Sequence, residues 1–247
     1  RSHNEDGLLC CAQQNLWAVA DGMGGHQRGE VASALALDVL REQVEQGCAL
    51  PEAAVGAHDA ILAAAVSDPA SQGMGTTLVA VTLQGNTFTL VWVGDSRAYR
   101  VSTQQIEPLS SDHSWVQEQV DAGVMSSAEA RQHPRRNVIT QCLGQAQDAP
   151  EPGVLVGELL PGEILLLCSD GLTGGLTDEQ LLQYSATAET LDKLVLQLVK
   201  ADNQNGGRDN VSCIGLACET PEVHVEPARR GWLSYFFPLR RRAERTS

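Results

Sequence analysis

Short apolar runs rich in β-branched residues set the strongest limit on how this 247-residue chain can fold. The runs are four to seven residues long and are bounded by Gly, Asn, Asp or Ser, which is typical of strands. Most of them follow one another without an intervening helix, and this favours antiparallel sheets over a doubly wound parallel sheet. The sequence therefore predicts an α+β fold, with strands at residues 16–20, 77–83, 88–93, 98–101, 164–168 and 211–216.

Helical periodicity marks three further segments of the chain. Val31, Leu35 and Val39 recur on one helical face, and Gly47 is placed to end that helix. Pro51 at a first-turn position and an Ala-rich body predict a second helix over about residues 51–66, and a periodic apolar face predicts a third around residues 191–198.

The composition is that of a globular chain, with 43% apolar and 19% charged residues. No apolar run approaches the ~18 residues that a membrane-spanning helix needs. Seven cysteines without a CxxC pair disfavour a disulfide framework or a zinc ribbon and favour a reducing, cytoplasmic compartment. Residues 1–226 hold 11 basic and 30 acidic residues, a balance that excludes nucleic-acid binding by general electrostatics.

Four aspartates stand where an apolar run meets a turn. Asp21 and Asp170 each end such a run and are followed by glycine, whereas Asp6 and Asp209 each precede one. Asp-Gly is common in hairpin turns, and for any single position that explanation is sufficient. Four carboxylates brought together without a positive partner would repel one another and require a cation. Oxygen ligands without a His or Cys cluster predict a hard ion, Mg²⁺ or Mn²⁺, rather than zinc.

Six short motifs occur in the order that is found in one family of enzymes. They are Arg1-Ser-His-Asn-Glu-Asp6, Asp21-Gly-Met-Gly-Gly25, Gly73-Met-Gly-Thr-Thr77, Val93-Gly-Asp-Ser-Arg97, Ser169-Asp-Gly171 and Arg208-Asp-Asn-Val211. In this order they resemble the metal-dependent protein phosphatases of the PPM, or PP2C, class, and the second motif resembles that of the bacterial members. The resemblance spans about residues 1–217.

This resemblance implies a four-layer sandwich, in which two stacked antiparallel β-sheets are flanked by pairs of helices. It implies a PP2C-like phosphatase domain over residues 1–218. The polar segment at about residues 110–136 would be an insertion, or flap, over one end of the sheets. Residues 219–247 would form a basic, aromatic C-terminal tail beyond the domain.

The resemblance also implies which residues form the catalytic centre. Asp21 would bridge two metal ions, and the carbonyl oxygen of Gly22 would bind one of them. Asp170 and Asp209 would complete the shell of the other ion.

Further residues would lie around this centre in the same family. Asp6 and Glu5 would hold metal-bound waters or ligate directly, and Asn210 would support or ligate the ions beside them. Asp112 resembles the aspartate that helps bind a third, weaker ion in bacterial members. Arg1 matches the arginine that binds the substrate phosphate.

Paired cations suit phosphoester hydrolysis. Two ions ~3.5–4 Å apart lower the pKa of a bridging water, so that hydroxide attacks phosphorus in line. The Arg1 guanidinium would match the phosphate with two donors at once. Met23 stands where animal members of the family carry a histidine proposed as general acid, and Met cannot donate a proton. His26 and His113 are alternative donors, although a metal-bound water is preferred.

The sequence thus predicts a phosphatase that uses Mn²⁺ or Mg²⁺ and acts on phosphoserine and phosphothreonine in proteins, opposing a bacterial Ser/Thr kinase. Two alternatives stay open. A serine hydrolase would use Ser96, which follows a strand in a Gly-x-Ser sequence, although Ala98 replaces the second glycine of a nucleophile elbow. A pseudophosphatase would bind phosphorylated partners without hydrolysing them. It would need to have lost a ligand, whereas the expected aspartates are all present.

The tail differs from the body in charge. Residues 227–247 hold six Arg and one Glu, and residues 232–237 hold four of the ten aromatic residues. Aromatic rings beside arginines suit an anionic membrane surface or a site on a partner protein. The acidic body offers the same segment a surface within the chain. Any membrane contact of the tail is therefore expected to be weak and salt-sensitive.

Overall fold

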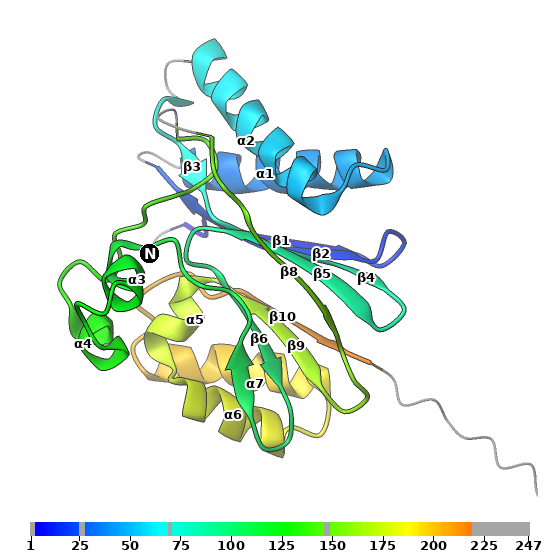
Figure 1. Cartoon of the computed structure of the whole chain (residues 1–247), viewed down its shortest axis with the longest axis vertical. Helices are drawn as coiled ribbons and strands as arrows, with labels where there is room; N and C mark the ends of the chain where they lie inside the picture. Colours follow the sequence, from blue (N-terminus) through cyan, green and yellow to red (C-terminus); the bar gives the residue numbers. More distant parts are fainter. Residues whose placement is uncertain (1–2, 25–27, 69–70, 146–148, 219–247) are drawn as a thin grey trace, which may run out of the picture.

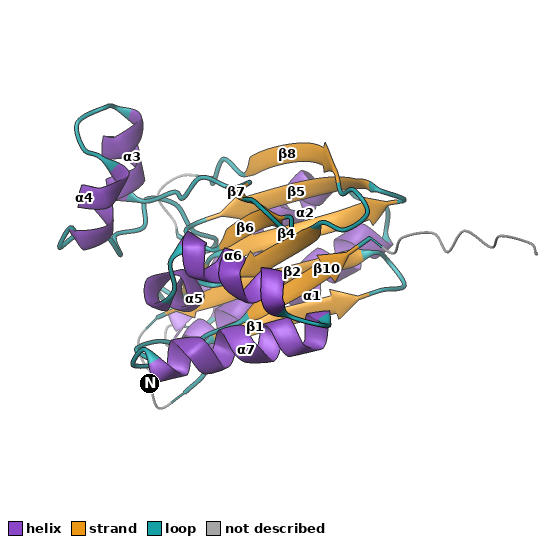
Figure 2. Ribbon diagram, turned by 90° about the horizontal axis from the view of Figure 1, so that it is seen from below, coloured by secondary structure: helices purple, strands orange, loops and turns teal. Residues whose placement is uncertain are grey.

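The computed structural model describes residues 3–24, 28–68, 71–145 and 149–218. Two antiparallel sheets stack face to face, and helices cover both outer faces (Figures 1 and 2). The predicted α+β fold, a sandwich of two antiparallel sheets flanked by helices, is confirmed.

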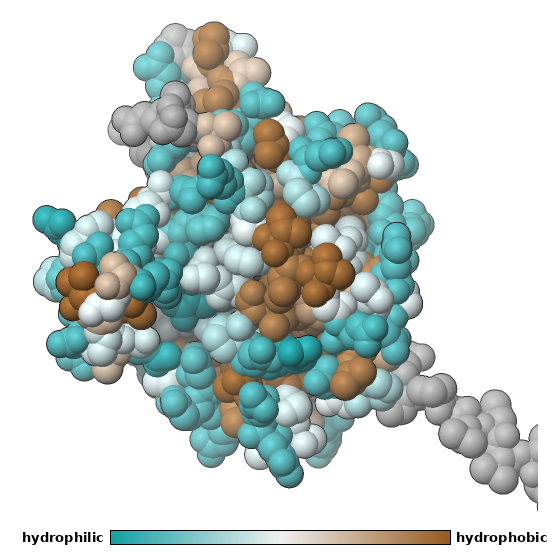
Figure 3. Space-filling model, viewed as in Figure 1, coloured by the Kyte–Doolittle hydropathy of each residue, from teal (hydrophilic) through white to brown (hydrophobic). Residues whose placement is uncertain are grey.

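The larger sheet carries the N-terminal half of the predicted site. Its strand order is β1 (Asp6–Cys11), β2 (Leu16–Met23), β4 (Leu78–Gln84), β5 (Thr87–Val93) and β8 (Gly153–Glu158), and the short β3 (Gly75–Thr76) pairs with the end of β2. The outer face is covered by α1 (Arg28–Glu45) and α2 (Leu50–Ser67). The edge strand β8 leaves Val154 47% and Val156 63% exposed, and apolar side chains gather over it in Figure 3.

The smaller sheet carries the C-terminal half of the predicted site. Its strand order is β10 (Cys213–Ala217), β9 (Ile164–Cys168), β6 (Arg97–Val101) and β7 (Ile106–Pro108). Its outer face is covered by α5 (Asp170–Gly175), α6 (Asp178–Thr187) and α7 (Leu191–Gln204).

Three apolar clusters fill the spaces between the four layers. Because side chains alternate across a strand, the adjacent residues Leu166 and Leu167 of β9 enter different clusters. Leu166 packs with Leu194 and Leu198 under α7, whereas Leu167 packs between the two sheets. The sheets are thus fixed to each other and to their helices, so the strand ends that carry the aspartates have a rigid support.

The flap contains two short helices, α3 (Trp115–Asp121) and α4 (Ser127–Gln132), which project from one end of the sandwich (Figure 2). Ser114 caps α3, and Ser126 forms a capping box with Glu129 at the start of α4. The helices are therefore stabilised by local sequence rather than by a large apolar face.

The buried face of helix α1 is centred on small residues beside the periodic positions. Val31 is 43% exposed, whereas Ala32, Ala36 and Leu40 are fully buried. The face of small residues lets the helix approach the sheet more closely than branched side chains would allow. The predicted helix is thus present, and Leu35 and Val39 of the predicted face pack at the margin of the buried cluster, whereas Val31 does not.

Candidate active site

Four segments bring the predicted aspartates to one end of the sandwich. Asp6 begins β1 and lies opposite Asp21 of β2 in the strand register. Asp170 follows β9 and opens α5, and Asp209 lies just before β10, which pairs with β9. The Asp21 carboxyl lies within hydrogen-bonding reach of Asp170, which joins the two halves of the site across the sheets.

Burial disfavours the charged forms of two of these carboxyl groups, Asp21 and Asp6. Burial, followed by the negative charges of Asp6 and Asp170, raises the pKa of Asp21 to about 10. Burial also raises the pKa of Asp6, although a hydrogen bond from the Ser169 hydroxyl favours its charged form. A cation bound between these groups would reverse both effects.

One oxygen atom tests whether the residues present suit a metal ion. Oδ2 of Asp6 accepts a 2.9 Å hydrogen bond from Ser169 Oγ, whereas Oδ1 is buried without a hydrogen-bond partner among the described residues. A buried polar atom left unpaired is costly, and a bound ion removes that cost. The all-carboxylate donor set fits Mg²⁺ or Mn²⁺.

The carboxylates of the site lie near one another but do not converge on a single point. No three His, Cys, Asp or Glu side chains in the described ranges converge closely enough to hold an ion as they stand. Binding of an ion here would require these carboxylates to change their positions.

Two threonines hold the strand end that carries Asp21. The Asp21 N–H donates to Thr77 Oγ1 at 3.0 Å, and the Asp21 carbonyl accepts from Thr76 Oγ1 at 3.0 Å and from the Thr77 N–H at 2.9 Å. The sequence alone assigned no such role to the Gly-Thr-Thr motif, because these bonds join residues more than 50 positions apart.

The two Asp-Gly pairs serve close backbone approach rather than hairpin turns. A Cβ atom on Gly22 would lie 2.1 Å from the carbonyl oxygen of Gly29, so glycine is needed where α1 starts against β2. A Cβ atom on Gly171 would lie 1.9 Å from the carbonyl oxygen of Asn210, which brings α5 against the loop of Asp209. The hairpin explanation is therefore wrong at both positions.

Asn210 ties the N-terminal segment to the Asp209 loop. Its Oδ1 accepts from the Glu5 N–H at 3.0 Å, and its Nδ2 donates to the carbonyl of His3 at 3.1 Å. Its own N–H donates to Asp209 Oδ1 at 2.7 Å. These contacts orient Asp209 and the backbone of Glu5 together.

Asp112 is held by an arginine. Arg97 donates from Nε to Oδ1 at 2.7 Å and from Nη2 to Oδ2 at 2.6 Å. Burial alone would lower the pKa of Arg97, but its hydrogen bonds to Asp112 raise it well above the usual value. Asp112 also faces Asp95, whose pKa rises to about 8, mainly through burial and then through Asp170 and Asp112. No role for Asp95 or Arg97 was predicted from sequence, although the Gly-Asp-Ser-Arg motif contains both.

Of the two histidines considered as proton donors, His113 lies within the described residues. The N–H of Gly94 donates to Nδ1 of His113 at 3.3 Å, and burial lowers the pKa of this histidine, which disfavours it as a general acid. Arg1 and His26 lie outside the described residues.

Ser96 is not placed as a nucleophile. Its side chain is buried, and its hydroxyl shares a 2.7 Å hydrogen bond with Thr77 Oγ1. It lies in a turn from strand β5 to strand β6, whereas a nucleophile elbow leads from a strand into a helix. The serine-hydrolase alternative is not supported.

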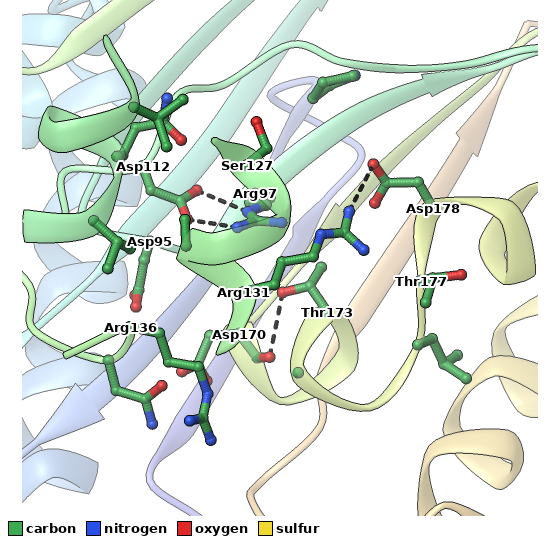
Figure 4. A pocket seen from close by; sticks show the side chains of 18 of the residues that line it. Asp95, Arg97, Asp112, Ser127, Arg131, Arg136, Asp170, Thr173, Thr177 and Asp178 are labelled. Atoms are coloured by element: carbon green, nitrogen blue, oxygen red, sulfur yellow. Dashed lines mark hydrogen bonds and ion pairs between the residues drawn. The ribbon is translucent and has the colours of Figure 1, made fainter. Parts of the chain in front are cut away.

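A cavity of about 420 Å³ opens beside Asp95 and Asp170 (Figure 4). The flap forms one wall, and α5 with the start of α6 forms the other. The carboxylate cluster thus has an open polar hollow next to it, large enough for several side chains.

Comparisons with known proteins agree with this geometry. The family model "Protein phosphatase 2C" matches residues 1–207. The chain is 37% identical over 220 residues to "Serine/threonine protein phosphatase PstP" of Mycobacterium tuberculosis, covering 87% of this chain and 42% of that protein. It is 32% identical over 227 residues to "Serine/threonine phosphatase stp" of Listeria monocytogenes, covering 87% of this chain and 90% of that protein.

A solved structure shows the same likeness. The catalytic domain of PstP in complex with two manganese ions has a TM-score of 0.77 and 33% identity, covering 87% of this chain and 91% of that one. The chain spans less than half the length of the mycobacterial protein. From its six ordered motifs, its stacked sheets and these matches, the chain belongs to the protein phosphatase 2C family.

Proposed function

We propose that this chain is a metal-dependent phosphoprotein phosphatase that hydrolyses phosphoserine and phosphothreonine. The observation that carries the proposal is the buried carboxylate cluster in which Asp6 Oδ1 has no hydrogen-bond partner among the described residues. The names of PstP and stp and the two manganese ions in the PstP structure support the same reading.

Mn²⁺ or Mg²⁺ would be held by the carboxylates of the cluster, with a main-chain oxygen beside them. A bound pair of such ions supplies a hydroxide at neutral pH and neutralises the charge that develops on the phosphoryl group. The proposed ligands are Asp6, Asp21, the carbonyl of Gly22, Asp170 and Asp209.

The surrounding residues would orient these ligands. Thr76 and Thr77 fix the backbone of Asp21, and Asn210 fixes the Asp209 loop against Glu5. A direct contact of Glu5 or Asn210 with an ion stays a prediction. Asp112 would contribute to a third, weaker ion only by giving up part of its contact with Arg97.

Hydrolysis of a phosphothreonine peptide tests the proposal. Phosphate release should require Mn²⁺ or Mg²⁺, stop with EDTA and resume when excess Mn²⁺ is added. Turnover that persists in EDTA would reject the metal-dependent mechanism. Peptide binding without turnover at saturating Mn²⁺ would favour the pseudophosphatase instead.

We further propose phosphorylated proteins and a cognate Ser/Thr kinase as partners. Residues 1–218 would form the phosphatase domain, with the flap at 110–136. Arg1, proposed to bind the substrate phosphate, and the tail at 219–247 lie outside the described residues. The cytoplasmic location and the weak contact of the tail with a membrane or partner stay predictions. Within the described ranges, no helix is both long and apolar enough to cross a membrane.

A further inference from the structure

The cavity beside the carboxylate cluster is lined mainly by charged and polar side chains. Asp95 and Asp170 line the part next to the cluster, and flap residues line much of the remainder (Figure 4). Uncharged polar side chains that can bond a peptide backbone stand along it. They are Gln117, Ser127, Asn137, Thr173 and Thr177. A peptide held by its phosphorylated side chain at the cluster would place neighbouring residues in this hollow.

The flap wall concentrates positive charge in an otherwise acidic chain. Three arginines, at positions 131, 135 and 136, fall within six residues of a chain whose net charge is −14. Arg135 lies over the Trp115 ring, with its guanidinium carbon 5.0 Å from the ring centroid, and does not line the cavity. The other two do line it.

The arginines of the cavity differ in how their charge is balanced. Arg97 is locked to Asp112 by two short hydrogen bonds, and Arg131 reaches Asp178 at 3.3 Å. Arg136 is exposed and forms no ion pair with any residue in the described part of the chain. Figure 4 draws Arg136 on the same side of the hollow as Asp170, away from the pair formed by Arg131 and Asp178.

We propose that this cavity binds the residues next to the phosphorylated side chain, and that Arg136 selects substrates with an anionic group there. A guanidinium matches a carboxylate or a second phosphoryl group with two donors, and Arg136 has no internal partner to displace. The acidic remainder of the protein repels an anionic substrate, so the contact with Arg136 would distinguish substrates that place their anionic group in the cavity from those that do not. The inference rests on the proposed function, because it assumes that the phosphorylated residue is held at the carboxylate cluster.

The test compares phosphothreonine peptides that differ only in their flanking residues. One is flanked by aspartate, one by alanine and one by lysine, and a fourth carries a second phosphothreonine. Hydrolysis is measured with Mn²⁺ for the full chain and for two matched variants, Arg136→Gln and Arg135→Gln. Both variants remove one positive charge from the flap, but only the first removes it from the cavity. The ratio of kcat/KM between peptides cancels changes in the catalytic centre that all peptides share.

Arg136→Gln should lower the aspartate-to-alanine ratio about fivefold, and Arg135→Gln should leave it close to the wild-type value. Arg136→Glu should reverse the preference of the wild type, so that its kcat/KM is higher for the lysine-flanked peptide than for the aspartate-flanked peptide. The doubly phosphorylated peptide distinguishes a second phosphoryl group from a carboxylate as the preferred anion.

The assignment of Arg136 would be overturned if Arg136→Glu kept the wild-type aspartate-to-alanine ratio of kcat/KM. It would also be overturned if Arg136→Gln and Arg135→Gln lowered that ratio equally. If the wild type hydrolyses none of these peptides, the proposed function fails separately. Fluorescence anisotropy of the same peptides then decides the role of Arg136 from the ratios of Kd, with the same expected and contradicting outcomes.

Discussion

Two clusters of buried charge stand at the same end of the molecule, both within electrostatic reach of Asp95, and they are balanced differently. In the first, burial and the charges of Asp6 and Asp170 raise the pKa of Asp21, and burial raises the pKa of Asp6. In the second, Arg97 and Asp112 satisfy each other with two hydrogen bonds. We propose that a cation completes the first cluster, whereas the two side chains of the second pair with each other. We therefore expect substitutions in the first cluster to remove tight metal binding and most of the activity, and substitutions in the second to lower stability while the tight metal sites remain.

The largest effect is expected from Asp21→Asn. This change keeps the shape of the side chain but removes the charge proposed to bridge two cations. Activity on a phosphothreonine peptide should fall by orders of magnitude even at high Mn²⁺. Asp38→Asn, an exposed carboxylate of α1, is the matched control and should retain activity. Retention of more than about a tenth of the wild-type kcat by Asp21→Asn would refute the bridging role.

Arg97→Ala should produce the largest loss of stability. It leaves Asp112, whose side chain is only 11% exposed, without its partner. The expected decrease in the free energy of unfolding is about 2–3 kcal/mol, measured by urea denaturation in EDTA. The double variant Arg97→Ala with Asp112→Ala should recover part of this loss, because no unpaired charge remains. If the double variant loses more unfolding free energy than the two single variants together, Arg97 and Asp112 are not the self-contained pair described above.

Asp112→Ala tests whether Asp112 belongs to the catalytic centre. The tight metal sites should survive, while turnover and its dependence on Mn²⁺ concentration change. Loss of the tight sites in a calorimetric titration would instead place Asp112 in the catalytic centre and remove the distinction drawn here.

Thr77→Val should have a smaller effect, on both stability and kcat. It removes the acceptor for the Asp21 N–H and the partner of the Ser96 hydroxyl. The expected loss of stability is about 1–2 kcal/mol, and kcat should fall with it because the Asp21 backbone is no longer fixed. Unchanged kcat in a folded Thr77→Val variant would show that Thr77 does not position Asp21.

The smallest effect expected is a gain. In EDTA at neutral pH, Asp21→Asn should be as stable as the wild type or more stable by up to about 1 kcal/mol, because asparagine need not take up a proton to be buried among the other carboxyl groups. A clear loss of stability in EDTA would mean that the cluster is balanced without an ion.

The strands and the acidic residues at their ends could be predicted from sequence, because both depend on local patterns. Strand β8 could not, since Gly153 and Gly157 interrupt its pattern. Their missing side chains leave room for the rings of Trp92 and Phe88 on β5, and a Cβ at either glycine would lie less than 3 Å from a ring carbon.

Helix α6 was missed because its apolar face is weak, with Leu181 as its buried residue. The capping box of Thr177 and Gln180 is the signal that could have revealed it. The pairing of Arg97 with Asp112 depends on the tertiary fold, and no spacing rule connects residues 15 positions apart on a strand and a loop. The assignment of individual metal ligands stays a prediction.

Calorimetric titration of Mn²⁺ into the metal-free chain, in parallel with Asp21→Asn and Arg97→Ala, tests the central claim most directly. The account predicts two tightly bound ions in the wild type, as expected for a paired-metal site. It predicts loss of tight binding in Asp21→Asn and retention of it in folded Arg97→Ala. Equal affinity and stoichiometry in wild type and Asp21→Asn would contradict the claim that the acidic cluster is completed by metal ions.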